Sequence, residues 1–339
     1  MKQFRVLLIA IMVLNAAGAQ NPASAKFKLL YTFPGGPGVP TNLHEVSPGL
    51  FYGSAAGNYG TVGGEIFSIT SAGTFQNISQ FPGSLEPDWV MPAEGGKLFG
   101  SESQGGNYPS YFTMKFNGSD MQSHSAGAFG TSFNGYPYTI PAPNGEFFAA
   151  TGASRTALAI VKIDLQGSIS TVHAFSGSEG QPVIDATLLR GEDGSFYGIN
   201  ALPNNGSSEA WVYRLTPQGE FIKLGILPVL SLLRPPLVLA PDGTLYGATF
   251  KGGSNYAGQI FKISPGGPLS ILATFPANGG MFGPTSLFMA DDGNLYGTTL
   301  SAISYFFRVV LPSGKLEKLY ADGGAGAACT CPMLQGSDS

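Results

Sequence analysis

The sequence predicts an all-β fold, and three observations support this prediction. Only 11% of the residues are charged, whereas Gly (49) and Pro (25) are abundant and aromatic residues make up 12% of the chain. Short stretches rich in Phe, Tyr, Ile, Val and Leu alternate with turns that contain glycine. A stretch that reads Leu-Tyr-Gly or a close variant of it, called here the Leu-Tyr-Gly stretch, returns at a nearly constant interval. This combination is typical of exported β domains, and the apolar content argues against disorder.

The repeat is clearest when the Leu-Tyr-Gly stretches are aligned. The six stretches end at residues 53, 100, 149, 198, 247 and 297, at intervals of 47 to 50 residues. Their aromatic residues recur in every unit, so we expect Tyr52, Phe99, Phe148, Tyr197, Tyr246 and Tyr296 to form core between units. A fixed period of this length indicates a propeller or a solenoid.

Unit five shows the internal order of a repeat. A Pro-led apolar stretch (235–241) precedes Asp242-Gly243, the strand that ends at Gly247, a loop, the apolar run 259–264, a second glycine turn and the run 270–275. Asp-Gly and Asn-Gly between apolar runs predict tight hairpins with type I′ turns. By the same comparison, "DDGNLYGTT" (291–299) is interpreted as a hairpin and not as a calcium loop, and no metal site is expected.

Four short strands in each unit predict a six-bladed β-propeller built from six repeats of about 49 residues. A solenoid is the alternative, but its repeats are usually shorter, and a seventh blade would need about 35 more residues than the chain offers. Either "FKLLYTF" (27–33) or "KLEKLYA" (315–321) should complete the last blade. We therefore expect one propeller domain over 26–322 and a flexible tail over 323–339.

The first residues have the pattern of a secretory signal peptide. Lys2 and Arg5 precede a short apolar run, and small residues follow it. We expect a signal peptide over 1–19, with cleavage after residue 25 as the alternative. No later stretch approaches about 18 consecutive apolar residues, so no membrane span is expected. The prediction is a protein that is secreted, periplasmic or on the cell surface.

Charge and cysteine content limit the class of partner. Loss of Lys2 and Arg5 with the signal peptide would change the net charge from −4 to −6. A mildly acidic surface argues against nucleic acid as a partner. Cys329 and Cys331, the only two cysteines, lie in the predicted tail with a spacing that suits neither a disulfide nor a zinc site. We expect no cofactor and a monomer.

The repeats resemble the GloVer-type repeat of the choice-of-anchor tandem repeat family. The segment "PDGTLYGATFKGGSNYAGQIFKISPGG" (241–267) is most similar to that repeat, and 50–70 and 291–299 keep parts of it. The resemblance implies a bacterial exported protein with a propeller-like array, and it implies no reaction. The C-terminal sequence "GAACTCPMLQGSDS" lacks the sorting segment that anchors many members.

Motifs for catalysis are absent from the sequence. There is no Gly-x-Ser-x-Gly elbow, phosphate loop or Rossmann glycine pattern. A glycosidase would need two acids about 5–10 Å apart. The acids whose location makes them candidates are Glu86, Asp88, Glu102, Glu179 and Asp185.

Propeller geometry places the variable loops and the connections between blades on one face, which we call the loop face. Variable loops on a rigid scaffold often carry function. The candidate ligand-binding residues on this face are Tyr59, Tyr108, Tyr256 and Trp89, although each could instead pack structurally. The leading hypothesis is an exported, non-catalytic propeller that binds carbohydrate or protein. The alternatives are a glycan hydrolase or lyase on the same scaffold and a purely structural surface protein.

Overall fold

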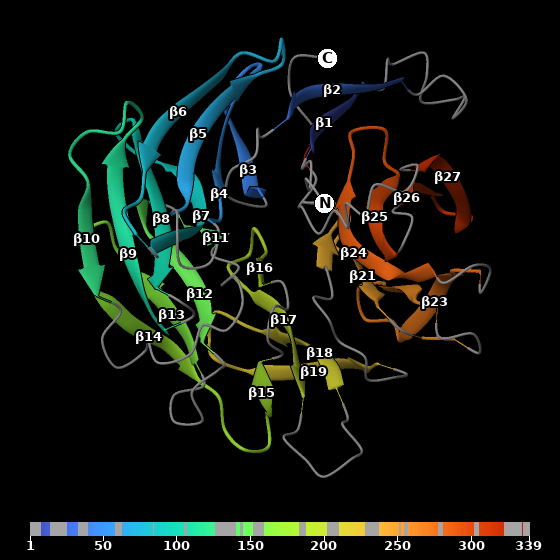
Figure 1. The fold of residues 1–339 in the computed structure, drawn as a ribbon. Coiled ribbons are helices and arrows are strands. Elements are labelled where there is room, and N and C mark those ends of the chain that lie inside the picture. Colours follow the sequence, from blue (N-terminus) through green and yellow to red (C-terminus); the bar gives the residue numbers. More distant parts are fainter. Residues whose placement is uncertain are drawn as a thin grey trace.

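Six antiparallel sheets form a ring in a computed structural model of the chain (Figure 1). Each sheet is one blade of a six-bladed β-propeller, as the repeat predicted. The structure describes residues 8–13, 26–32, 40–57, 63–83, 85–104, 107–125, 140–142, 145–151, 159–182, 188–201, 210–227, 237–250, 252–253, 257–276, 281–301, 305–321 and 334.

Each blade consists of strands that are consecutive in the sequence. The strands of blades 1 to 3 are β3 (Pro40–Ser47), β4 (Leu50–Ala55), β5 (Glu65–Thr70) and β6 (Phe75–Gln80); β7 (Leu85–Ala93), β8 (Lys97–Gln104), β9 (Asn107–Lys115) and β10 (Gln122–Ser125); and β11 (Ile140–Pro141), β12 (Phe147–Thr151), β13 (Ala159–Ile163) and β14 (Ile169–Ala174).

In blade 4 the innermost position is shared by two short strands, which both pair with β17. The strands of blades 4 to 6 are β15 (Gln181–Pro182), β16 (Leu189–Arg190), β17 (Phe196–Ala201), β18 (Ala210–Leu215) and β19 (Phe221–Ile226); β20 (Leu237–Leu239), β21 (Leu245–Thr249), β22 (Gln259–Ile263) and β23 (Leu269–Thr274); and β24 (Met281–Met289), β25 (Leu295–Ser301), β26 (Tyr305–Val310) and β27 (Lys315–Ala321).

Of the two predicted closing segments, the C-terminal one completes the last blade. β27 pairs with β26 as the outermost strand of blade 6. The N-terminal segment is β2 (Lys26–Thr32), which pairs with β1 (Leu8–Val13) in a separate two-stranded sheet. β1 lies inside the segment that we expect to be a signal peptide.

The hairpin turns with an Asp-Gly pair differ from the predicted type I′ geometry. In the turn between β20 and β21, the Gly243 amide donates to the Ala240 carbonyl at 2.9 Å, and Gly243 has φ 80°. Among the described residues, Asp120 is the one non-glycine residue with a positive φ, so Asp242 is not left-handed. This is a type I turn followed by a left-handed glycine. The Asp242 carboxylate instead accepts the Thr244 amide at 2.8 Å, which fixes the turn.

In five of the six blades, a glycine on the second strand lies beneath an aromatic ring on the third strand. Gly247 pairs in register with Phe261, and a Cβ on Gly247 would lie 2.2 Å from the ring. The other pairs of this kind are Gly53 with Phe67, Gly100 with Phe112, Gly198 with Tyr213 and Gly297 with Phe307. Blade 3 has Ala149 opposite Val161, so a smaller partner accompanies the added methyl group.

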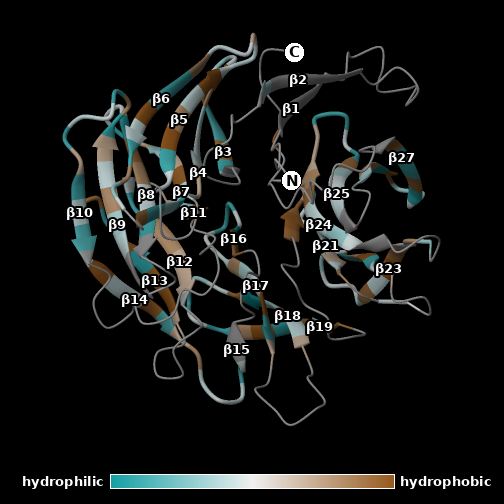
Figure 2. Ribbon diagram, viewed as in Figure 1, coloured by the Kyte–Doolittle hydropathy of each residue, from teal (hydrophilic) through white to brown (hydrophobic). Residues whose placement is uncertain are grey.

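Apolar side chains of neighbouring blades meet in five clusters. Between blades 1 and 2, Tyr52 and Ile66 pack with Phe112 and Met114. The corresponding sets are Trp89, Phe99, Phe147 and Val161 (blades 2 and 3); Ile160, Trp211 and Tyr213 (blades 3 and 4); Val212, Leu237 and Phe261 (blades 4 and 5); and Tyr246, Ile260, Leu295 and Phe307 (blades 5 and 6). The outermost strands β10 and β27 are mostly hydrophilic (Figure 2).

The remaining face of blade 1 is covered by both ends of the chain. Phe51, Phe67 and Ile69 are buried there, and Tyr31 of β2 and Leu334 pack against them. The ring of Tyr31 is stacked on Phe75 with a centroid distance of 4.0 Å. Among the described residues, this cluster contains no side chain of blade 6. The two chain ends therefore contribute apolar contacts at the seam of the ring.

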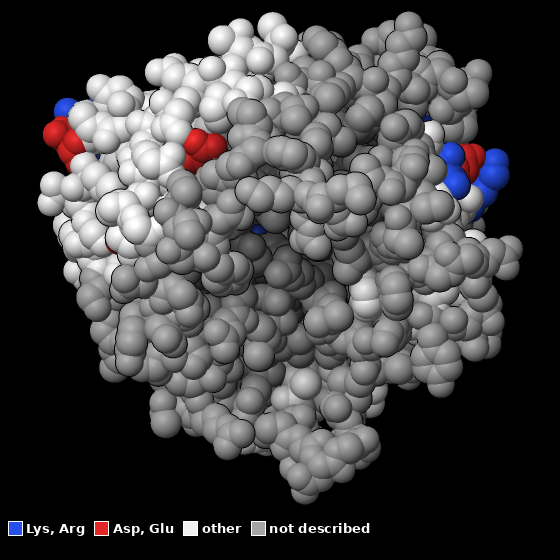
Figure 3. All heavy atoms as spheres, viewed as in Figure 1, with Lys and Arg blue, Asp and Glu red and all other residues white. Residues whose placement is uncertain are grey.

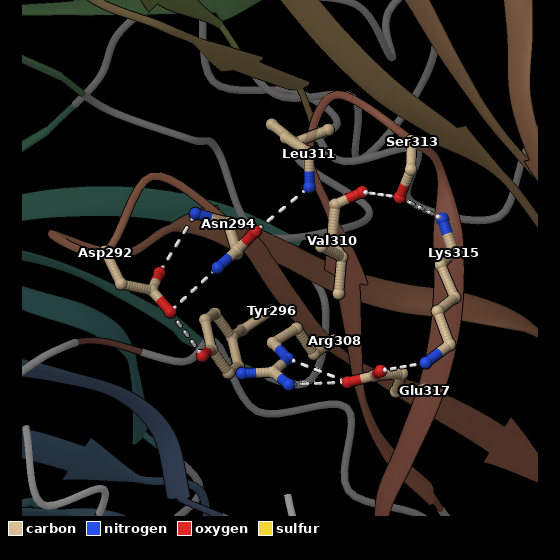
Figure 4. A network of polar contacts seen from close by, with 9 residues as sticks. All are labelled: Asp292, Asn294, Tyr296, Arg308, Val310, Leu311, Ser313, Lys315 and Glu317. Atoms are coloured by element: carbon tan, nitrogen blue, oxygen red, sulfur yellow. Dashed lines mark hydrogen bonds and ion pairs between the residues drawn. The ribbon is translucent and has the colours of Figure 1, made fainter. Parts of the chain in front are cut away.

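Blade 6 carries a polar network in the positions that face a neighbour in the other blades (Figure 4). Tyr296 donates to Asp292 at 2.8 Å, and Arg308 donates to Glu317 from Nε at 3.0 Å and from Nη2 at 2.5 Å. Burial raises the pKa of Asp292, but its hydrogen bonds from Asn294 and Tyr296 outweigh this effect and lower the pKa. The network ties the β24–β25 turn to β26 and β27.

We expect Gly247→Ala to lower the free energy of unfolding by about 1–3 kcal/mol, because its methyl group overlaps the Phe261 ring. Adding Phe261→Val reproduces the Ala–Val pair of blade 3 and should recover part of the loss. Gly177→Ala is the control, since nothing lies within 4 Å of its Cβ. Chemical denaturation followed by tryptophan fluorescence measures all three. A Gly247→Ala variant as stable as the parent would contradict the account.

Leu334→Ala should lower the free energy of unfolding by about 1–2 kcal/mol, because Leu334 is partly buried against blade 1. Hydrogen exchange should quicken in β4 and β5 more than in β21 and β22. Ile226→Ala is the matched control, because Ile226 is 60% exposed. Equal effects of the two variants would show that the contact of Leu334 with blade 1 does not stabilise the fold.

Candidate functional site

The predicted ligand-binding residues are only partly described by the structure. Tyr59 and Tyr256 lie outside the described residues, and of Tyr108 only the backbone, in β9, is described. Trp89 lies within β7 and is 4% exposed, with its ring 5.5 Å from Phe99 and 6.5 Å from Tyr111. The indole therefore packs between blades 2 and 3 and is not exposed at the surface.

The innermost strands of three consecutive blades share a local irregularity near the ring axis (Figure 1). In β3, β7 and β24 the register shifts directly after a proline: Pro40, Pro87 and Pro284. Proline is tolerated there because the innermost strand is a sheet edge. The shift is a β-bulge, which re-aims the next side chain. The residues that occupy the three bulges are Thr41, Asp88 and Thr285.

Each bulged side chain reaches a hydroxyl on the second strand of its own blade. Thr41 Oγ1 lies 2.5 Å from Ser54 Oγ, and Thr285 Oγ1 lies 3.2 Å from Thr298 Oγ1. In blade 2 the equivalent contact is Ser101 Oγ to Asp88 Oδ2 at 3.2 Å. We call these six residues the axial polar layer. Blades 6, 1 and 2 are neighbours, so the layer forms one arc of the ring.

Blade 2 departs from the other two blades by having a carboxylate where they have a hydroxyl. Asp88 is partly exposed, and its charge adds to burial in raising the pKa of Tyr111. Two more acids lie at the same end of the blade, since Pro87 pairs with Glu102 and Glu86 with Ser103. The structure therefore brings together three of the five candidate acids, Glu86, Asp88 and Glu102. Glu179 lies between blades 3 and 4, and Asp185 lies outside the described residues.

The three acids of blade 2 have different surroundings. Glu102 is 7% exposed and accepts a hydrogen bond from Ser123 Oγ at 2.6 Å. Glu86 is half-buried, and burial raises its pKa. Within the described part of the chain, the side chain of Glu86 has no hydrogen bond or ion pair. It is a desolvated carboxyl group that can accept donors from a ligand.

Next to the layer, Asn42 joins blades 1 and 2 through the backbone of β7. Its side-chain oxygen accepts the Val90 amide at 3.2 Å, and its side-chain nitrogen donates to the Val90 carbonyl. Ser54 Oγ donates to the same oxygen at 2.7 Å. These bonds hold β7, and with it Asp88, in a fixed position relative to blade 1.

Sequence reasoning did not identify the axial polar layer, although the signal was present. The first strands of units one, two and six read Pro-Thr-Asn, Pro-Asp-Trp and Pro-Thr-Ser. Aligning them at the proline shows an acid in one unit against threonine in two. The contact with a second-strand hydroxyl is visible only in the structure, because the bulge sets the direction of the side chain.

The described ranges contain neither a metal-ligand cluster nor a helix that could span a membrane. No group of three or more His, Cys, Asp or Glu side chains lies close enough to hold a metal ion. No helix in those ranges has the length and apolar character needed to cross a membrane. Among the described residues that are visible in Figure 3, the charged side chains lie mostly toward the edge of the molecule.

Solved structures with a similar fold have varied activities. No protein-family model and no curated protein matches the chain. An ulvan lyase, a polysaccharide lyase, has a TM-score of 0.56 at 12% identity, with 84% of each chain covered. The periplasmic gluconolactonase of Pseudomonas aeruginosa has a TM-score of 0.56 at 17% identity, with 88% of this chain and 89% of that chain covered.

A prolyl endopeptidase is similar over only part of its length. Its TM-score is 0.53 at 13% identity, and the match covers 85% of this chain but 43% of the endopeptidase. At these identities the likeness establishes the propeller fold, and the three activities belong to those proteins.

His44 makes the stability of blade 1 dependent on pH. It lies on β3 opposite Tyr52, and burial lowers its pKa from 6.5 to about 4. As the pH falls, His44 therefore binds its proton at a higher pH in the unfolded chain than in the folded chain. Stability from this group is complete above about pH 6.5, falls toward pH 4 and then levels off.

We expect the loss between pH 7 and pH 4 to be smaller by about 1–3 kcal/mol in His44→Leu than in the parent. Denaturant titrations at the two pH values measure it. An identical loss in both proteins would show that His44 titrates as it does in the unfolded chain.

Proposed function

We propose that the protein is an exported carbohydrate-binding propeller of the GloVer repeat type, whose ligand binds at the axial polar layer. The observation that carries this proposal is the replacement of a repeated threonine by Asp88 at the axial bulge of blade 2. Threonine fills the corresponding bulge in blades 1 and 6 and makes the same contact with a second-strand hydroxyl, so this contact does not require an acid in blade 2. A binding site can require one, because it must break the symmetry of the repeat.

The chemistry of the layer suits a hydroxylated ligand. Threonine and serine hydroxyls can donate and accept, whereas carboxylates accept strongly from hydroxyl donors. Glu86 adds an acceptor that has no described partner, and Asn42 keeps β7 in place beside blade 1. The similar folds of a polysaccharide lyase and a gluconolactonase add support, because both names refer to sugar chemistry.

A second candidate function is hydrolysis or elimination of a glycan at the same site. Its support is the half-buried carboxyl group of Glu86, because burial raises its pKa, which is the direction of shift that a general acid needs. Asp88 follows two residues later, at about 7 Å along the strand. A general acid and a nearby carboxylate are the groups that such a reaction needs.

Asp88→Thr tests the binding proposal, because it restores the residue found in blades 1 and 6. We expect its free energy of unfolding to stay within about 1 kcal/mol of the parent, since Thr41 and Thr285 already make the same contact. Its affinity for glycans that bind the parent on an array should fall at least about tenfold. Val172→Thr on the outermost strand β14 is the control, because Val172 is 43% exposed and lies outside the axial polar layer, and it should bind as the parent does.

Unchanged glycan binding by Asp88→Thr would contradict the axial site. If the parent binds no glycan and captures a protein instead, the proposal that the ligand is a carbohydrate is wrong. Release of new reducing ends or unsaturated products that Glu86→Gln abolishes would favour the enzymatic function.

A further inference from the structure

A second polar cluster lies between blades 3 and 4, away from the axial polar layer. His173 on β14 contributes from blade 3, and Asn200, Trp211 and Lys223 contribute from β17, β18 and β19 of blade 4. Glu179 lies in the connection between the blades, and its carbonyl accepts the Asn200 side-chain amide at 2.9 Å. The five residues therefore converge on one junction.

Two polar atoms in this cluster are buried without a hydrogen-bond partner. Asn200 and Trp211 are both 0% exposed, and they lie directly opposite each other in the β17–β18 pairing. Neither the Asn200 Oδ1 acceptor nor the Trp211 Nε1 donor has a partner in the described part of the chain. Each such group costs about 1–3 kcal/mol, and native proteins retain few of them. A hydroxyl group can satisfy both, because it donates and accepts.

Lys223 covers the ring of Trp211. Its ammonium lies 3.5 Å from the ring centroid, although the residue as a whole is exposed. Within the described residues it has no carboxylate partner. A long, exposed lysine can leave an aromatic face at the cost of a cation–π contact of about 0.5–1 kcal/mol. The indole face would then be open for stacking.

The acid in this cluster, Glu179, is already engaged in hydrogen bonds. Burial raises the pKa of Glu179, but hydrogen bonds from Ser176 outweigh it, so the pKa is lowered and the group stays ionised. Its carboxylate accepts the Ser176 amide at 2.6 Å and lies 3.3 Å from His173 Nε2. Gly180, with φ 75°, lets the connection pass against Trp211, since a Cβ there would lie 2.8 Å from the indole.

Two other buried polar atoms of the described residues, Trp89 Nε1 and Thr249 Oγ1, also lack a partner, and blade 6 provides the contrast to the junction of blades 3 and 4. Lys318 covers the Tyr305 ring at 3.7 Å, as Lys223 covers the Trp211 ring. In the strand pairing, Lys318 lies opposite Phe307 and Lys223 lies opposite Tyr213, and each of these two rings lies over the glycine of its own blade. The residue that corresponds to Asn200 is Thr299, and its hydroxyl accepts the Tyr305 amide at 3.1 Å. Blade 6 therefore has the covered ring without the unpartnered atoms.

We propose that the junction of blades 3 and 4 is a second binding site, for an acidic sugar of the uronate class. The sugar stacks on Trp211 after Lys223 has moved aside, and Lys223 pairs with its carboxylate. A ring hydroxyl reaches Asn200 Oδ1 and Trp211 Nε1. The inference rests on the proposed function for its ligand class only, since the two sites share no residue.

Fluorescence of Trp211 tests this site in the full-length protein. The chain has two tryptophans, so Trp89→Phe leaves Trp211 as the sole reporter. We expect glucuronate to change its emission saturably and to bind about tenfold more tightly than glucose. Lys223→Met should raise the Kd for glucuronate about tenfold, and Lys318→Met should leave it unchanged. Saturation-transfer NMR on proteins that retain Trp89 gives the same comparison if Trp89→Phe does not fold.

Failure of this site can be told from failure of the axial site. Asp88→Thr should leave the Trp211 signal intact, whereas Lys223→Met should leave glycan binding at the axial polar layer intact. No saturable response to glucuronate would overturn the inference, and so would equal affinity for glucose or a Lys223→Met variant that binds as the parent does. In each of those cases the cluster serves packing alone.

Discussion

The packing of an aromatic ring over a glycine on the neighbouring strand is the interaction on which the rest of the structure depends. In five of the six blades, a glycine on the second strand leaves room for a ring of the third strand, and a methyl group there would block this contact. The rings then fill the spaces between blades, together with the Leu-Tyr-Gly aromatics on the opposite face. Where blade 3 lacks the glycine, Val161 replaces the ring. The residue pair on the second and third strands and the packing between blades therefore change together.

A scaffold with this regularity makes departures from the repeat informative. Asp88 replaces a threonine at the axis, and Asn200 with Trp211 leaves two polar atoms unpartnered between blades 3 and 4. At the seam, blade 1 meets both chain ends, and blade 6 carries the Tyr296–Arg308 network. The departures fall on the innermost strands, one junction and the seam, which are the places where a repeated unit can change without loss of its core.

The sequence was sufficient for the blade number and strand order, because the Leu-Tyr-Gly period is set by packing that every unit shares. It also predicted that the Leu-Tyr-Gly aromatics are core, which is confirmed for Tyr52, Phe99 and Tyr246. The turn type was wrong, since Asp-Gly suits both type I′ and type I with a following left-handed glycine. Trp89 could not be assigned from sequence, because an aromatic on a strand looks the same whether buried or exposed. The bulge that turns Asp88 toward Ser101 depends on strand register, which one sequence does not reveal.

Native-state hydrogen exchange tests the central claim most directly, that six equivalent blades are held by their second and third strands. The account predicts the slowest exchange in those strands of all six blades, faster exchange in outermost strands such as β10 and β14, and intermediate values in the innermost strand β3 at the seam. Slow exchange confined to one contiguous half of the chain, or protection of the outermost strands above that of β21 and β22, would contradict it.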